Sequence, residues 1–297
     1  MRCLTILLAP VLALVLAACA MVPAPAGWQA RLRGDTIALL GEVHDNAEQH
    51  RLRLAALERA VAAGWRPAIV MEQFDRERQG EIERARRERP RDAQHVIDLA
   101  APGADGWNWS FYRPVVAFAL AHDLPLIAAN LSNADAARIV RGGYAAVFDP
   151  ATVAALGLDG PIDPRLEGAQ EREIDAGHCH ALPPAAWPRM ARAQLARDAV
   201  MAAALRRHAA GGAVLLAGNG HVRRDIGVPR WLGPDADRAL SIGFLEEGGA
   251  TPTTAFDAVV RTAPEARSDP CARFVQPSRR VSAASSHSPV ASSWRTT

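Results

Sequence analysis

Three short polar motifs, each directly after an apolar run, contain the residue types that carry out chemistry. Glu42 and His44 follow the first run, Glu72 follows the second, and His221 follows a later run within a Gly-Asn-Gly-His sequence. Imidazole and carboxylate ligands together suit divalent Mn, Fe, Co or Zn. A carboxylate at the end of a buried strand is costly unless it is paired, hydrogen-bonded or bound to a metal. The four residues therefore predict a divalent metal site.

Such a site would be catalytic if its metal activated a water molecule for hydrolysis, with Glu42 or Glu72 as the general base. The alternative to a metal site is a purely structural role. In that case the glutamates cap neighbouring helices, and His44 and His221 are hydrogen-bonded loop residues. That interpretation suits each residue alone. Their shared position after apolar runs favours a joint site, because ligands bind outside the carboxyl ends of parallel strands, where distant loops converge.

Two further polar residues are candidates for the same cleft. Arg197 interrupts an apolar stripe of the long helical segment 185–209. Its guanidinium either pairs with Glu42 or Glu72 or holds an anionic ligand such as a carboxylate or propionate. His178 precedes Cys179 in a Gly-His-Cys-His sequence whose spacing is too tight for a single tetrahedral metal site, so we interpret it as a cleft residue.

The aromatic residues allow two interpretations. Trp107, Trp109, Phe111 and Tyr112 cluster ahead of and within a helical segment, and Tyr144 follows a pair of glycines. Such clusters are usually part of a core. Around a cleft, exposed aromatic rings would instead suit a flat apolar ligand.

The elements that position these residues alternate between apolar runs and amphipathic segments, which favours an α/β fold with a mostly parallel sheet flanked by helices. The last two strands have only a short linker, so we expect them to pair antiparallel at one edge. The predicted strands are 36–40, 68–71, 124–128, 213–217, 240–245 and 256–260, and the predicted helices 47–63, 111–122, 134–140 and 185–209.

The N-terminus has the layout of a secretory signal: a basic start, an apolar stretch from Leu4 to Ala18 that is too short to span a bilayer, and small residues before Cys19. Leu16 to Cys19 resembles a lipobox, which predicts lipidation of Cys19. We expect a signal peptide (1–18), a tether (19–27), one α/β domain (28–262) and a Pro/Ser/Arg-rich disordered tail (263–297). Ala20 after the cysteine favours the outer membrane.

The composition of the chain bears on which classes of molecule it could bind. The net charge is +2 and the arginines are mixed with acidic residues, so nothing indicates binding to nucleic acid. Once Cys3 leaves with the signal and Cys19 carries lipid, Cys179 and Cys271 are left to pair in an oxidising compartment.

Several motifs in matching order resemble the ChaN family of haem-binding uptake lipoproteins, within the Tiki superfamily. The resemblance covers roughly residues 28–262. It rests on GEVHDN (41–46), MEQF (71–74), FYRP (111–114), HCHALP (178–183), AQLARDA (193–199) and GNGHVR (218–223).

The resemblance implies an α/β domain in which Glu42, His44, Glu72 and His221 match the superfamily's motif residues, which are thought to form a metal-dependent hydrolase centre in other branches. It also implies haem bound at a homodimer interface through a tyrosine. We choose Tyr144 over Tyr112 as that ligand.

Two functions follow. The first is a lipid-anchored haem-binding protein for haem or iron acquisition, with Tyr144, Tyr112, Arg197 and His178 as haem contacts and an outer-membrane haem transporter as partner. The alternative is a metal-dependent, peptidase-like hydrolase that uses Glu42, His44, Glu72 and His221.

Overall fold

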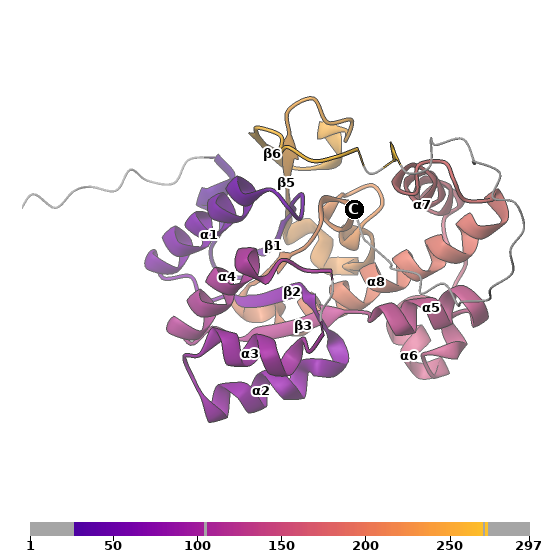
Figure 1. Cartoon of the computed structure of the whole chain (residues 1–297). Coiled ribbons are helices and arrows are strands. Elements are labelled where there is room, and N and C mark those ends of the chain that lie inside the picture. The colour runs from indigo at the N-terminus through magenta and orange to yellow at the C-terminus, as the bar shows by residue number, and fades with distance from the viewer. Residues whose placement is uncertain (1–26, 104–105, 270, 273–297) are drawn as a thin grey trace, which may run out of the picture.

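The computed structural model describes residues 27–103, 106–269 and 271–272, which form one six-stranded sheet flanked by helices (Figure 1). The strand order is β3-β2-β4-β1-β5-β6, and every pairing is parallel. The strands are β1 (Ile37–Leu40), β2 (Ala68–Asp75), β3 (Leu126–Asn130), β4 (Ala213–Leu216), β5 (Ala239–Glu246) and β6 (Ala258–Thr262).

The helices divide between the two faces of the sheet. They are α1 (Ala47–Ala62), α2 (Gln79–Glu88), α3 (Ala93–Ala100), α4 (Trp109–Ala121), α5 (Asn133–Gly142), α6 (Pro150–Ala155), α7 (Pro164–Gly177), α8 (Trp187–His208) and α9 (Asn219–Val222). Alternate strand residues point to opposite faces. Leu40 and Met71 pack in the core beneath α1 to α4, whereas Leu39 and Val70 pack against α8 on the other face.

The strands at the centre of the sheet are uninterrupted apolar runs, because helices cover both of their faces. All four residues of β1 and of β4 are buried. Polar residues appear only where these strands end. Catalytic or ligand-binding side chains can therefore lie only at the carboxyl edge of the sheet.

The prediction of an antiparallel edge pair is wrong, since β5 and β6 pair in parallel. The register explains how a short linker achieves this. Ala258 lies beside Ile242, halfway along β5, and Thr262 lies beside Glu246. Residues 247–257 therefore return along only four residues of strand, about 13 Å, which a loop with one 3-10 turn (Thr253–Ala255) can span.

The segment after β6 is held against the domain, although we expected the disordered tail to start at residue 263. Arg267 forms ion pairs with Asp45 and Glu246, and a disulfide joins Cys179 to Cys271. Figure 1 shows this segment running from β6 toward α7, across the edge where the strands end. The predicted signal peptide, Cys19 and nearly all of the tether lie outside the described residues, as does the tail from residue 273.

Gly27, the last residue of the predicted tether, begins a short 3-10 helix (Gly27–Arg31). No helix within the described ranges has the length and apolar character needed to cross a bilayer.

Candidate functional site

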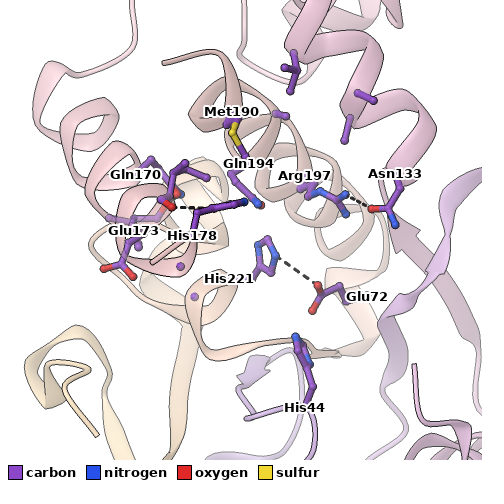
Figure 2. A pocket seen from close by; sticks show the side chains of 18 residues that line it. His44, Glu72, Asn133, Gln170, Glu173, His178, Met190, Gln194, Arg197 and His221 are labelled. Atoms are coloured by element: carbon purple, nitrogen blue, oxygen red, sulfur yellow. Dashed lines mark hydrogen bonds and ion pairs between the residues drawn. The ribbon is translucent and has the colours of Figure 1, made fainter. Parts of the chain in front are cut away.

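Three of the four motif residues meet around Gly218, at the carboxyl end of β4. The backbone N–H of Gly218 donates to Glu72 Oε2 at 2.8 Å. A Cβ on Gly218 would lie 2.9 Å from His44 Cε1, so only glycine leaves room for this ring. His221 Nε2 lies 3.5 Å from Glu72 Oε1. His44, Glu72 and His221 consequently line one cavity (Figure 2).

Glu42 lies behind this cavity and does not line it. Its carboxylate, 2 % exposed, accepts hydrogen bonds from His44 Nδ1 at 2.7 Å, from the Tyr112 hydroxyl at 2.5 Å and from Arg53. Because a carboxylate only accepts, the His44 proton lies on Nδ1, and the neutral ring carries its lone pair on Nε2. Glu42 therefore orients His44, whose Nε2 is free for the cavity.

Behind Glu42, His50 completes a buried polar cluster. Arg53 donates to His50 Nδ1 at 2.9 Å, and His50 Nε2 donates to the backbone carbonyl of His44 at 3.0 Å. Both ring nitrogens are thus satisfied only in the neutral form. Burial lowers the pKa of His50 to about 4, against which the hydrogen bond to His44 has a smaller effect.

His221 is oriented by a second carboxylate. Its Nδ1 lies 2.6 Å from Asp198 Oδ1, so Nδ1 carries the proton and Nε2 faces Glu72. Burial raises the pKa of Asp198 to about 6. Burial also opposes the charge on His221, but the neighbouring Glu72 and Asp198 outweigh it and leave the His221 pKa above its usual value.

Glu72 keeps one oxygen for a ligand. The side chain is fully buried, and Oε1 has no hydrogen-bond partner among the described residues, while Oε2 accepts from Gly218. Burial works against ionisation of Glu72, yet the neighbouring imidazoles of His221 and His44 bring its pKa below the usual value. A buried acceptor without a donor costs about 1–3 kcal/mol, so this oxygen is suited to a donor group of a ligand or a water.

The hydrogen-bond partners of Arg197 are not the ones that we expected. We expected an ion pair with Glu42 or Glu72, but its guanidinium donates to the side-chain oxygens of Asn130 and Asn133, at 2.7 Å each. The residue that forms an ion pair with Glu42 is Arg53. Arg197 still lines the cavity, so its charge is available to an anionic ligand group.

The walls of the cavity come from three helices. Residues of α5, α7 and α8 stand above the strand ends, and Ile174 and Met190 give these walls an apolar surface. His178, the residue directly after α7, points into the cavity in Figure 2. Its Nδ1 lies 2.7 Å from the carbonyl oxygen of Ile174. The cavity measures about 140 Å³.

Neither tyrosine lines this cavity. Tyr112 is 1 % exposed, its hydroxyl donates to Glu42, and burial raises its pKa above the usual value. Tyr144 is half-buried and lines a separate groove with Phe148, Val153 and Arg192. Burial raises the pKa of Tyr144 to about 12.

The predicted divalent metal site is not supported. No group of three or more His, Cys, Asp or Glu side chains within the described ranges is arranged to hold a metal ion. Glu42, one of the four expected ligands, is instead occupied by Tyr112 and Arg53.

Sequence reasoning missed Asp198, Arg53 and the cavity-lining helix α7. A signal existed for the first two. Asp198 falls on the helical stripe of Leu195 and Ala202, and Arg53 falls on that of Ala56 and Leu57, all of which are buried. A charged residue on such a stripe must be buried, and it therefore needs a partner. For α7 the sequence shows no strong apolar periodicity.

Comparison with known proteins identifies the family. Residues 28–232 match the family described as haem-binding uptake, Tiki superfamily, ChaN. The solved structure "Cofacial heme binding to ChaN of Campylobacter jejuni" is similar, with a TM-score of 0.62, 19 % identity, and coverage of 77 % of this chain and 87 % of that chain. At this identity the likeness concerns the fold.

Two other structures are more distant. The type III effector HopBA1 has a TM-score of 0.40 and 14 % identity, covering 77 % of this chain and 88 % of that chain. A Bacillus cereus protein has a TM-score of 0.38 and 13 % identity, covering 74 % and 70 %. None of the curated proteins matches the chain significantly. The family match spans more than half of the sequence, so this chain belongs to the ChaN family of haem-binding uptake proteins in the Tiki superfamily.

Proposed function

We propose that this protein binds haem at the mouth of the cavity above β1, β2 and β4, as a lipid-anchored protein of the cell envelope that takes part in haem or iron acquisition. One observation carries the proposal: the cavity combines apolar helical walls with imidazole nitrogens that hold free lone pairs. A porphyrin needs the apolar surface, and its iron needs a nitrogen, sulfur or oxygen ligand.

The residues that line the cavity fit haem in kind. Ile174 and Met190 offer apolar contact, and His178, which lines the same cavity, offers a nitrogen. Arg197 has no carboxylate among its hydrogen-bond partners, so it suits a propionate. When bound, haem would supply the iron that is the cargo of acquisition.

The size of the cavity argues for a second covering surface. Its volume of about 140 Å³ is below the roughly 300–1,000 Å³ of pockets that enclose drug-sized ligands. Haem would therefore lie partly outside it, with one face uncovered. We infer that a second copy of this chain would cover that face. The similar Campylobacter jejuni protein is described as binding haem cofacially.

A hemin titration of the full-length, detergent-extracted protein tests the proposal. We expect a Soret band that shifts and saturates at a fixed ratio of hemin to protein, and a size-exclusion mass that rises if haem joins two copies. Absence of saturable binding would refute haem binding, whereas saturable binding without a change in mass would refute only the dimer.

The cell-envelope location rests on Cys19 and the lipobox-like residues before it. Lipid on Cys19 would hold the domain at the outer membrane, within reach of a haem transporter there. The globular domain could then receive haem without crossing a bilayer.

Hydrolysis is a second candidate function, and the free Oε1 of Glu72 favours it. His44 Nε2 would take a proton from a water bound at Glu72, the resulting hydroxide would attack a carbonyl carbon, and protonated His221 would donate a proton to the leaving group. This scheme needs no metal. Hydrolysis of nitrophenyl esters by chelator-treated protein, lost in His44→Ala, would support it; equal rates in the two proteins would refute it.

A further inference from the structure

We propose that the cavity binds a free α-amino acid with an aliphatic side chain. Its ammonium group would lie among Glu72, His44 and His221, and its carboxylate would face Arg197. Haem is a far larger ligand, and we place it at the mouth of the cavity. The inference therefore goes beyond the proposed haem function and does not depend on it.

Three hydrogen-bond acceptors in the cavity lack a donor among the described residues. Oε1 of the fully buried Glu72 has no hydrogen-bond partner there. His44 and His221 each hold a proton on Nδ1, which faces a carboxylate, so each neutral ring has its lone pair on Nε2. Such a set of acceptors suits a ligand group with several N–H donors.

These three acceptors lie close together (Figure 2). His221 Nε2 is 3.5 Å from Glu72 Oε1. A Cβ on Gly218 would lie 3.0 Å from His44 Nε2 and 3.8 Å from Glu72 Oε2, so both side chains border the same space. A primary ammonium group carries three N–H donors, one for each acceptor, whereas a water molecule has only two.

The charges around this point favour a cation. Burial opposes a charge on His221, but the carboxylates of Glu72 and Asp198 outweigh it and raise the His221 pKa above its usual value. A bound ammonium group would supply the same positive charge in place of the His221 proton. The chain contains no lysine, so none of its side chains can provide an ammonium group here.

Arg197 supplies the opposite charge for a carboxylate. Its guanidinium donates to Asn130 and Asn133, and no carboxylate is among its hydrogen-bond partners in the described part of the chain. Burial lowers the pKa of Arg197, whereas the nearby Glu72 acts to raise it. The two charges are thus neighbours in one cavity without a direct hydrogen bond, and a zwitterion would bridge them.

The size and the walls of the cavity limit the rest of the ligand. A cavity of about 150 Å³ can hold a molecule the size of benzene, and this one measures about 140 Å³. Val140, Ile174 and Met190 add apolar side chains to its walls. A ligand of about six to ten non-hydrogen atoms fits this volume, which admits valine or leucine.

Calorimetric titration of the full-length, detergent-extracted protein tests the inference, in a buffer free of amines and of hemin. The ligands are L-valine, L-leucine, isocaproate, which is leucine without its ammonium group, and isoamylamine, which is leucine without its carboxylate. Leucine is also titrated into Glu72→Gln. The matched control is Glu173→Gln, because Glu173 also lines the cavity but is 50 % exposed and paired with Arg223.

We expect wild type to bind leucine or valine saturably, at one per chain. Isocaproate and isoamylamine should bind about tenfold more weakly or less, since each lacks one charged hydrogen-bonding group. Glu72→Gln should lose affinity for leucine to the same degree, while Glu173→Gln matches wild type.

No saturable binding of either amino acid would overturn the inference, as would isocaproate or isoamylamine binding as tightly as leucine. These ligand comparisons use wild type alone, so they hold even if Glu72→Gln fails to fold. Because hemin is absent, a negative result would leave the proposed haem function untouched, and failure of the hemin titration would leave this site untouched.

Discussion

Glu42 and Arg53 form a buried ion pair in which neither side chain is more than 4 % exposed. The pair joins the end of β1 to the middle of α1, and the same carboxylate orients His44. The cavity is therefore built on a charged cluster that lies within the core.

Removing one member of this pair should be costly. We expect Glu42→Leu to destabilise the protein by about 3–5 kcal/mol, since the Arg53 guanidinium would stay buried without its partner. Urea unfolding of Glu42→Leu, Arg53→Leu and the double variant measures the coupling. The double variant should be more stable than either single variant; strictly additive losses would show that the two charges do not interact.

Acid should destabilise the protein through His50. Its pKa is about 4 in the folded chain and about 6.5 when unfolded. Below pH 6.5 the unfolded state binds more protons, so stability present above that pH is lost as the pH falls to about 4. The loss should approach about 2–3 kcal/mol. Urea unfolding from pH 8 to pH 4 should show this slope in wild type and a smaller one in His50→Gln; equal slopes would assign the loss to other groups.

Gly218 should not tolerate a side chain. A Cβ there would lie 2.9 Å from the His44 ring, whereas a Cβ on Gly220 would meet nothing within 4 Å. We expect Gly218→Ala to lower the free energy of unfolding by about 1–3 kcal/mol through overpacking. Gly220→Ala serves as the control, and comparable stability of the two variants would contradict this account of the site.

The disulfide should support both the fold and the cavity. It joins residues separated by 92 positions, so Cys179→Ser with Cys271→Ser should cost about 2–4 kcal/mol. The double variant should also bind hemin more weakly, because the loop that carries His178 loses its attachment. Thermal unfolding and hemin titration are measured together. Unchanged affinity despite lower stability would mean that the disulfide has no part in positioning His178.

Lipidation should depend on Cys19. We expect Cys19→Ser to incorporate no palmitate and to leave the membrane fraction, because acyl chains provide about 0.8 kcal/mol of membrane binding per buried CH₂. Palmitate labelling and cell fractionation of the full chain measure this. Labelling of the variant at the wild-type level would exclude Cys19 as the modified residue.

Tertiary structure placed the candidate residues in ways that local patterns do not encode. Glu42 and Glu72 look alike in the sequence, since each follows a buried strand. In the fold, Glu42 accepts hydrogen bonds from His44, Tyr112 and Arg53, whereas Oε1 of Glu72 has no hydrogen bond and lies 3.5 Å from His221 Nε2. The partners that make this difference come from α1 and α4, so no spacing near either glutamate distinguishes the two.

The sequence by itself determined the α/β class, the positions of the six strands and the motifs at their carboxyl ends, because strands buried on both faces must be apolar and must place polar groups where they stop. Only the tertiary structure decided the direction of β6, the partners of Arg197 and the nitrogen that each histidine turns to the cavity. These depend on contacts between residues far apart in the chain, and such contacts leave no periodic pattern.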